Sequence, residues 1–248
     1  MPFDWAVQQL RLSIFSNEPV SVTEQDWKTL TGQDEAETRT ALPGGKQYAG
    51  KSFGGLFSIS YSGTRADILL DVDATTEDMT EDQKLPCIGK WDKLSASFTG
   101  IIEPFLEYVK FPIVRIAFGA ILACPVASKE DAYKLLDELL DSVDIDPKNM
   151  RELIYRINWP QMSKVIPDLE LNRITNWSAV NVTRKLLQMT GAEMSVAAAG
   201  PLLQAVRLDI DHSTAQGNIA PFEKAQRVPI FQELVKMAGE NAEAGECP

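Results

Sequence analysis

The chain contains few of the side chains that build most metal sites and hydrolase triads. Among its 248 residues there are three cysteines, Cys87, Cys124 and Cys247, and one histidine, His212. A structural zinc ion takes four Cys or His ligands, usually in closely spaced pairs, and a Ser-His-Asp triad needs a histidine base. The wide spacing of the cysteines therefore excludes a zinc site of the usual kind, and His212 is the only base that a hydrolase triad could use.

A widespread nucleotide-binding motif is absent as well. The chain has no Gly-x-Gly-x-x-Gly segment. This motif places a helix N-terminus against a dinucleotide. We interpret the glycine pairs at 44–45 and 54–55 as turns rather than phosphate-binding loops, and the missing motif favours a protein that is not an enzyme.

Basic residues are outnumbered by acidic ones. The chain has 24 Lys and Arg against 35 Asp and Glu, which gives a net charge of −11 at pH 7. Proteins that coat nucleic acid or dock on anionic lipid need clustered Lys and Arg. The charge therefore argues against general nucleic-acid binding and against membrane docking, and it supports solubility.

The sequence gives no sign of export or of a membrane span. The segment Met1–Trp5 is acidic and lacks the basic and apolar regions of a signal peptide, and the longest apolar run, near 116–126, is too short to cross a bilayer. Sparse, widely spaced cysteines fit a reducing compartment. We expect a cytoplasmic protein.

Apolar residues recur with the periods of strands and helices along most of the chain. Alternation predicts strands over residues 7–15, 53–62, 65–73, 112–123, 152–159, 169–187 and 202–211. Spacings of three and four predict a long helix over 91–109, kinked at Pro104, and capping boxes predict helices that begin at Ser21 and Ser128. The strand at 112–123 is apolar on both faces, so we expect it to be central and covered on both sides.

The remaining segments have different expectations. Residues 33–51 are polar and contain Pro43-Gly44-Gly45, which predicts a loop or the tip of a long hairpin. Residues 74–84 are acidic and predict an exposed loop. Pro221 and Pro229 suit the first turns of two short helices or of one kinked helix, and the polar tail 240–248 is expected to be frayed and flexible.

Two stretches of the chain are similar to each other. Residues 10–30 and 114–136 each read as a strand, a Pro-Val turn and a capped helix with an aromatic-Lys step, Trp27-Lys28 in the first and Tyr133-Lys134 in the second. The pattern indicates an internal duplication, although a strand followed by a proline and a capped helix is also a common arrangement. It predicts an α+β fold in which two β-α-β-β-like repeats form antiparallel sheets with helices packed on one face. We expect one compact unit, with residues 1–110 as the first repeat plus a long helix and residues 111–248 as the second repeat with a C-terminal helix.

Two acidic pairs are the strongest candidates for a site. Leu70-Asp71-Val72-Asp73 and Leu208-Asp209-Ile210-Asp211 share one pattern at the ends of expected strands. A period of two places both aspartates of each pair on one face. If the pairs converge, Asp71, Asp73, Asp209 and Asp211 could hold Mg²⁺, with Arg65 or Arg207 facing a phosphate and His212 acting as general base. The alternative is that strands end at solvent, where aspartate favours the turn that follows.

One resemblance to a family rests on two segments. Phe111-Pro112-Ile113-Val114-Arg115-Ile116-Ala117-Phe118 follows the long expected helix, and Leu208–Asp211 precedes a C-terminal helix that contains Phe231-Gln232-Glu233-Leu234. In these segments the chain resembles a sporadically distributed family of uncharacterised prokaryotic proteins of about this length. It departs from that family where Gly119-Ala120-Ile121-Leu122 replaces a segment of the Arg-Tyr-Ile-Asn type. The resemblance implies a setting in mobile elements or phage defence.

Three hypotheses for function follow. The leading one is a non-enzymatic interaction protein or accessory subunit that binds another protein or a second copy of itself, because catalytic constellations are missing and tryptophans are frequent. The alternative is a Mg²⁺-dependent phosphoryl- or nucleotide-processing enzyme centred on the two aspartate pairs, which requires the pairs to meet. The third is a small-molecule-binding module in a cleft between the two repeats.

Overall fold

A wide antiparallel sheet forms the body of the protein. The computed structural model describes residues 3–73, 85–182, 185–190, 193–198 and 202–246, of which 185–190 and 193–198 are described as backbone alone. The strands are β1 Ala6–Phe15, β2 Thr38–Leu42, β3 Gly45–Ser52, β4 Gly55–Ser62, β5 Arg65–Asp71, β6 Gly89–Lys90, β7 Arg115–Val126, β8 Ile154–Asn158, β9 Gln161–Met162, β10 Glu170–Val182, β11 Lys185–Thr190, β12 Glu193–Ala198 and β13 Leu203–Thr214. The helices are α1 Glu24–Thr31, α2 Trp91–Tyr108, α3 Lys129–Leu139 and α4 Lys224–Ala244.

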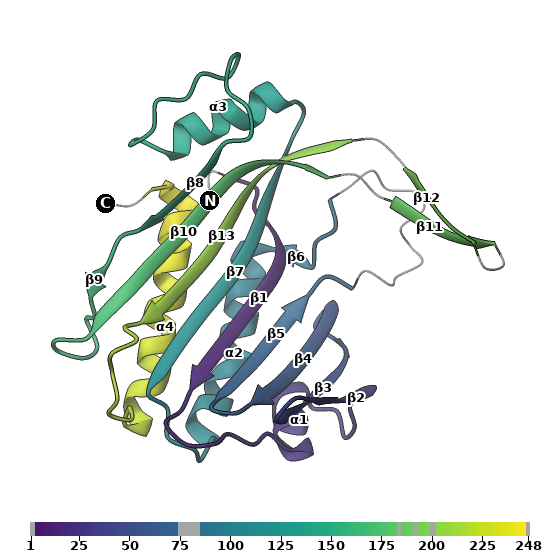
Figure 1. The fold of residues 1–248 in the computed structure, drawn as a ribbon. Coiled ribbons are helices and arrows are strands. Elements are labelled where there is room, and N and C mark those ends of the chain that lie inside the picture. Colours follow the sequence, from purple (N-terminus) through teal and green to yellow (C-terminus); the bar gives the residue numbers. More distant parts are fainter. Residues whose placement is uncertain (1–2, 74–84, 183–184, 191–192, 199–201, 247–248) are drawn as a thin grey trace.

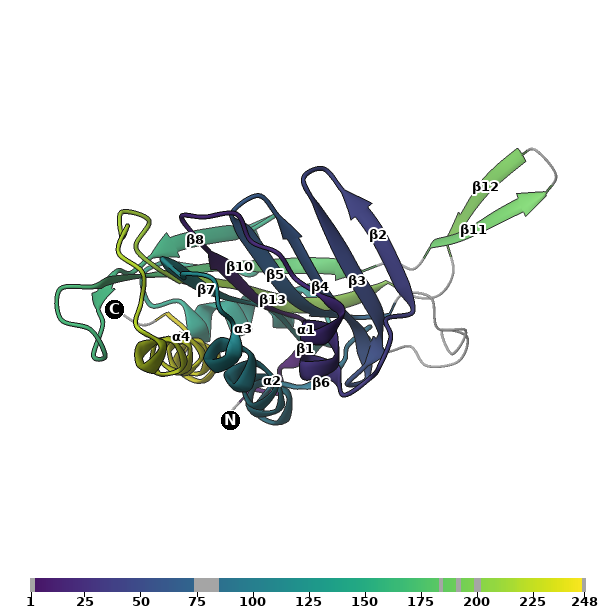
Figure 2. The same cartoon turned by 90° about the horizontal axis from the view of Figure 1, so that it is seen from below.

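Eleven of these strands share one sheet. Its order is β2-β3-β4-β5-β1-β7-β13-β10-β8, with β6 paired to β1 and β9 paired to β10. All four helices lie on one face of this sheet (Figure 1), and Figure 2 shows them together beneath it. The predicted α+β class with an antiparallel sheet and helices on one face is therefore confirmed. No helix in the described part of the chain is both long and apolar enough to cross a membrane.

The core lies between the sheet and the two long helices, α2 and α4. Alternate residues of β1 face the helices, and Leu10, Leu12 and Ile14 are at most 1% exposed. The Phe118 ring of β7 lies 5.9 Å from that of Phe231 on α4. Burying each such side chain contributes about 1.5–3 kcal/mol, so this layer holds the helices on the sheet.

The strand order is symmetrical about the central antiparallel pair of β1 and β7. Each of these strands is followed by a short helix, α1 after β1 and α3 after β7. The outer neighbour of each is the last long strand before a long helix: β5, which is followed by the two-residue strand β6 and then α2, and β13, which is followed by α4. Trp27 and Tyr133 occupy matching places and are both buried. The topology thus has the arrangement expected of two related repeats that meet at β1 and β7.

Several local predictions were wrong at identifiable points. Helix α1 is capped by Thr23, whose box partner is Asp26, and not by Ser21. Ser128 does cap α3, since its Oγ accepts from the Asp131 amide at 3.1 Å. Of the two predictions for residues 33–51, the hairpin is the one that the structure shows, because β2 and β3 pair on either side of the Pro43-Gly44 turn. The turns at 44–45 and 54–55 are confirmed, and Gly44 and Gly54 take φ values of 70° and 80° there.

The C-terminal tail was also mispredicted. Helix α4 is a single helix that contains Pro229 and continues to Ala244, so most of the segment predicted to fray is helical. Asn241, Ala242 and Glu246 are buried. The tail is fixed because the Trp5 indole donates to the Ala242 carbonyl at 2.7 Å. The acidic loop predicted at 74–84 lies outside the described residues.

A second, smaller sheet is formed by β11 and β12. These strands pair only with each other among the described residues, and they extend away from the main sheet in both views (Figure 1, Figure 2). The prediction of one strand over 169–187 is therefore corrected, because β10 ends at Val182 and β11 belongs to this separate hairpin.

Candidate functional site

The sheet face opposite the helices, which we call the open face, is rich in charged side chains. The pairing register and the alternation of side chains place basic and acidic residues there in nearly equal number. The basic residues are Arg11, Lys51, Arg65, Arg115, Arg156 and Arg207, and the acidic ones are Asp67, Asp71, Glu170, Asp209 and Asp211. Because the whole chain carries a charge of −11, the acidic excess lies mainly outside this face.

Both predicted aspartate pairs lie on the open face, but they do not meet. Asp71 lies opposite Gln9, Gln9 lies opposite Ile121, and Ile121 lies opposite Asp209. Three strand spacings of about 4.8 Å separate the two aspartates by about 14 Å, whereas Mg²⁺ binds its oxygen ligands at about 2.1 Å. Among the residues that the structure describes, no group of three or more His, Cys, Asp or Glu could hold a metal ion. The geometry therefore does not favour a shared ion.

Each of the first two candidate carboxylates has its own partner. Asp71 accepts from Gln9 Nε2 at 3.0 Å and from the Val72 amide at 2.8 Å. Asp73 pairs with Lys51, whose Nζ lies 2.8 Å from Oδ2. These aspartates hold the ends of β5 and β3 together.

The second aspartate pair is likewise engaged. Arg207 Nε donates to Asp209 Oδ1 at 2.6 Å, and Arg11 Nη2 donates to Asp211 Oδ1 at 3.1 Å. Arg207 was predicted to face a phosphate, but its guanidinium is turned to the carboxylate two residues along its own strand. The Arg11–Asp211 pair spans β1, β7 and β13, so it joins the two halves of the sheet.

His212 is not a general base at this site. It follows Asp211 on β13, and the period of two places it on the helical face, where it is fully buried. Its Nδ1 lies 3.3 Å from the Leu234 carbonyl of α4. Burial lowers the pKa of His212 to about 3, so it is neutral and inaccessible to any molecule on the open face. The prediction of a catalytic role for His212 is wrong for this reason.

Strand β7 is central, as predicted, but the helices of the described residues cover only one of its faces (Figure 2). Small residues lie there, and the side chain of Arg11 crosses directly over one of them, Gly119. A Cβ at position 119 would lie 3.0 Å from Arg11 Nη2. The apolar appearance of β7 on both faces therefore has two causes: helices cover one side, and arginine side chains cover the other.

Arg115 is a half-buried basic residue of the open face that lies against an aromatic ring. Its Cζ lies 4.8 Å from the centre of the Phe15 ring, and Arg65 lies 5.3 Å from the same ring. Arg115 Nη2 donates to Ser213 Oγ at 3.0 Å. Burial lowers the pKa of Arg115, the charge of Asp211 raises it and that of Arg65 lowers it. In the described part of the chain, Arg115 forms no ion pair with a carboxylate.

Neighbouring arginines differ in this respect. Arg65 donates to Asp67 at 2.7 Å, and Asp67 also accepts a hydrogen bond from Ser13. Arg115 is thus held against an aromatic ring and a hydroxyl. No short motif marks this residue, because its surroundings come from β1, β5 and β13.

The segment Gly45–Ser52 matches the Gly-x-x-x-x-Gly-Lys-Ser spacing of phosphate-binding loops. In those proteins the segment is a loop between a strand and a helix, and its amides point at the phosphates. Here it is strand β3, paired along its length with β2 and β4. The backbone amides of this strand are used in hydrogen bonds to the neighbouring strands, so the spacing match does not indicate a phosphate site.

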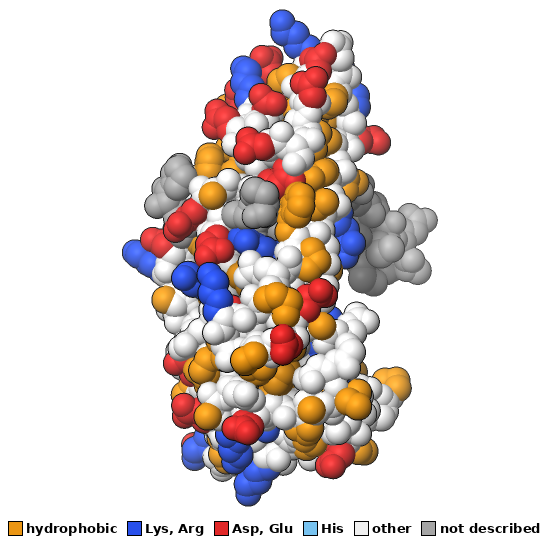
Figure 3. All heavy atoms as spheres, turned by 90° about the vertical axis from the view of Figure 1, so that its left-hand side faces the viewer, with side chains coloured by type: hydrophobic (Ala, Val, Ile, Leu, Met, Phe, Trp, Pro, Cys, Tyr) orange, Lys and Arg blue, Asp and Glu red, His pale blue; other side chains and the backbone are white. Residues whose placement is uncertain are grey.

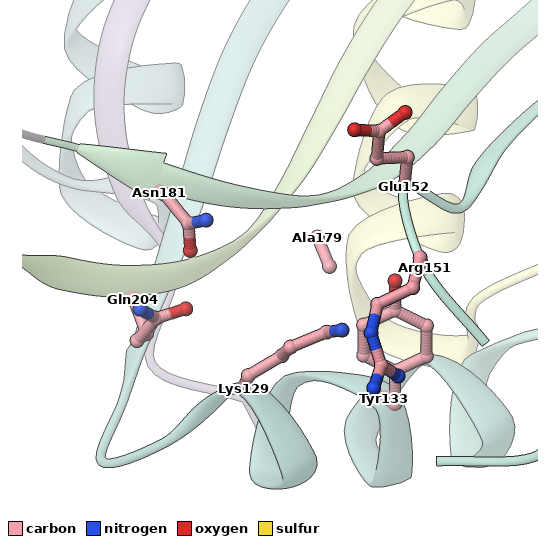
Figure 4. Close-up of a pocket in the computed structure, with 7 residues that line it drawn as sticks. All are labelled: Lys129, Tyr133, Arg151, Glu152, Ala179, Asn181 and Gln204. Carbon is pink, nitrogen blue, oxygen red and sulfur yellow. The ribbon is translucent and has the colours of Figure 1, made fainter. Parts of the chain in front are cut away.

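A cavity of about 270 Å³ lies on the helical face beside α3. It is lined by Lys129, Tyr133, Arg151, Glu152, Ala179, Asn181 and Gln204 (Figure 4). These residues come from α3, from the segment before β8, and from β10 and β13. Sequence reasoning placed a small-molecule site between the two repeats, whereas this cavity lies within the second one.

Elsewhere on the surface, charges of both signs are mixed. On the side seen in Figure 3, acidic and basic side chains are interspersed, with hydrophobic atoms between them. Four of the five tryptophans add little to the surface, because Trp5, Trp27, Trp91 and Trp177 are at most 3% exposed. These four are core residues, whereas Trp159 is half-buried.

Comparisons with protein-family models, with curated proteins and with solved structures found no match for this chain.

Proposed function

We propose that the protein is a non-enzymatic interaction protein that binds a partner protein on its open face, with Arg115 and Phe15 at the centre of contact. The observation that carries the proposal is the half-buried Arg115 guanidinium, which lies on the Phe15 ring and, among the described residues, has no carboxylate partner. Arginine and aromatic residues dominate the energetics of protein interfaces when they lie in a desolvated centre.

The surroundings of Arg115 fit a protein partner better than a reaction centre. Arg11, Arg65 and Arg207 are each paired with an aspartate. Such pairs form a polar rim that supplies hydrogen bonds without an uncompensated charge. A carboxylate of the partner would form an ion pair with the Arg115 guanidinium. Such a charge-assisted hydrogen bond is stronger than one between neutral groups.

The same geometry gives little support to the enzymatic alternative. The four candidate aspartates are paired with cations or amides and lie in two separate places. His212 lies on the other face and is buried. A Mg²⁺-dependent phosphoryl transfer would need these groups to converge on one substrate.

The proposal is tested by purifying the protein from its own cells with bound partners. Arg115→Glu should remove the co-purifying partner or dissociate the oligomer, because it places a carboxylate where the partner supplies one. Arg39→Glu is the matched control, since Arg39 lies on the other side of the sheet and pairs with Glu24 of α1. Its reversal of charge is the same, and it should leave binding intact.

The measurement is mass spectrometry of the purified material together with its molar mass by light scattering. A wild-type chain that remains a lone monomer at micromolar concentration, with no partner, contradicts the proposal. Equal loss of the partner in both variants contradicts the role of Arg115.

The proposal also includes a cytoplasmic location and a setting in phage defence or mobile elements. Cell fractionation tests the location, and phage challenge of a deletion strain tests the setting.

A further inference from the structure

We infer that the cavity beside α3 is a binding site for a small organic anion, a compact molecule that carries carboxylate or phosphate groups. This inference is independent of the proposed function, because the cavity lies on the helical face and the partner site on the open face. The observation that carries it is the meeting of two cations and two amides around one cavity in an acidic protein (Figure 4).

The two cations come from separate segments. Lys129 is the first residue of α3, and Arg151 belongs to the segment before β8. Lys129 Nζ donates to the Met150 carbonyl at 3.2 Å and lies 5.1 Å from the centre of the Tyr133 ring. Within the described residues, neither Lys129 nor Arg151 forms an ion pair, so both charges are available to an anion.

Arg151 is held in position by the backbone around it. Its Nη1 donates to the carbonyls of Lys148 and Met150 at 3.0 and 2.9 Å. Only one nitrogen of the guanidinium is used in these bonds. Nη2 and Nε are left with the planar geometry that binds an oxyanion through two parallel hydrogen bonds.

The opposite wall supplies amides. Asn181 on β10 lies opposite Gln204 on β13 in the sheet register. In Figure 4 their side-chain amides point toward the space between them and Lys129. Amide groups donate and accept hydrogen bonds, so this wall suits a polar group at the other end of the ligand.

Glu152 is the acidic residue of the lining, and it does not neutralise the cations. Its carboxylate points away from Lys129 in Figure 4. Its backbone has a φ of 56°, a left-handed conformation that is uncommon for a residue other than glycine and is often retained at functional sites. This conformation fixes the directions in which Arg151 and Glu152 leave the chain.

The remaining wall is buried and rigid. Tyr133 is 1% exposed, and its hydroxyl accepts from the Leu153 amide at 3.3 Å, while its own proton can be donated. A volume of about 270 Å³ is at the lower end of the range for small-molecule sites. The site therefore fits a compact anion and is too small for a dinucleotide.

The test is a titration of the full chain with inorganic phosphate, glycerol 3-phosphate and succinate in a chloride-free buffer at constant ionic strength, followed by NMR. Saturable shifts with the phosphate compounds alone identify a phosphate ligand, and saturable shifts with succinate alone identify a carboxylate ligand. Either result supports the inference. Lys129→Met and Arg151→Met should each raise the Kd about tenfold, which corresponds to about 1.4 kcal/mol.

Lys134→Met is the matched control. Lys134 lies about one turn further along α3, is exposed, and pairs with Glu130 at 3.0 Å. This variant should bind as the wild type does. Absence of saturable binding by all three probes overturns the inference, and so does an equal loss of affinity in Lys134→Met and Arg151→Met. Because Arg151 is exposed, its replacement should leave the fold intact, and the NMR spectrum verifies this.

Discussion

His212 makes the stability of the protein depend on pH in a way that one variant can isolate. Burial lowers the pKa of His212 to about 3, the Leu234 carbonyl raises it in part, and the charge of Arg173 lowers it. The ordinary value in an unfolded chain is about 6.5. Between these two values the unfolded chain binds a proton that the folded chain excludes, so the free energy of unfolding falls as pH falls below about 6.5.

The expected size follows from the two pKa values. Each pH unit between them changes the free energy of unfolding by about 1.4 kcal/mol, which gives a loss of about 2 kcal/mol between pH 8 and pH 5. His212 is the only histidine in the chain. Since histidine is the one side chain whose ordinary pKa lies between about 5 and 8, a single residue accounts for most of this change.

The assay is urea denaturation at four pH values from 8 to 5, followed by tryptophan fluorescence. His212→Leu replaces the imidazole with an apolar group that suits the buried position, so its free energy of unfolding should vary by less than about 0.5 kcal/mol over the same range. In the folded wild type, the imidazole NMR signal should not titrate above pH 5. If wild type and variant lose equal stability, the assignment of the pH dependence to His212 is refuted.

Three further predictions concern stability and are measured by urea denaturation at pH 7.5. Arg227→Met should lower the free energy of unfolding by about 2–4 kcal/mol. Arg227 donates at 2.9 Å to the buried Val109 carbonyl at the end of α2, and this carbonyl would lose its partner. A loss below about 0.5 kcal/mol would show that the carbonyl finds another donor. Gly45→Ala should cost about 2 kcal/mol or more, because its Cβ would lie 1.7 Å from the Tyr61 carbonyl oxygen, and an unchanged midpoint would contradict the close approach. Tyr155→Phe should lower the free energy of unfolding by about 1.5 kcal/mol, because the Tyr155 hydroxyl donates at 2.7 Å to the buried Glu246 carboxylate. The double variant with Glu246→Gln should lose less stability than the sum of the two single changes.

The parts of the fold that could be predicted are those with a strong local period. The alternation over 202–211 correctly predicted β13, whose Val206, Leu208 and Ile210 lie in the core, and the three-and-four spacing correctly predicted α2. The hairpin of β2 and β3 was predicted only as an alternative to a loop, and its strands were not placed, because β2 lies at the edge of the sheet. Most of β2 is exposed, so it has no apolar alternation to detect.

The strand order could not be read from local patterns. It depends on the pairing of β1 with β7 and of β7 with β13, which join residues at least 78 positions apart. This order determines the distance between Asp71 and Asp209. The period of two correctly predicted that each pair shares a face, but only the intervening strands show that the pairs are apart.

The site residues divide in the same way. The period of two already implies that His212 lies on the opposite face from Asp211, so this error could have been avoided from the sequence. Arg115 carries no such signal. Its position on Phe15 depends on the cross-strand pairing of residue 115 with residue 15, and an arginine on a strand is in most proteins a solvated residue.

The contacts on the open face join the two halves of the sheet. Arg11 comes from the first half and pairs with Asp211 of the second, whereas Arg115 comes from the second half and lies on Phe15 of the first. Each contact crosses the β1–β7 junction, in opposite directions. Gly119 leaves the space that the Arg11 side chain requires to cross β7.

A half on its own would expose an unpaired strand edge at this junction and would lack one member of each contact. The proposed partner surface is therefore a property of the paired halves, and a partner that binds at Arg115 would also stabilise the junction between them by mass action.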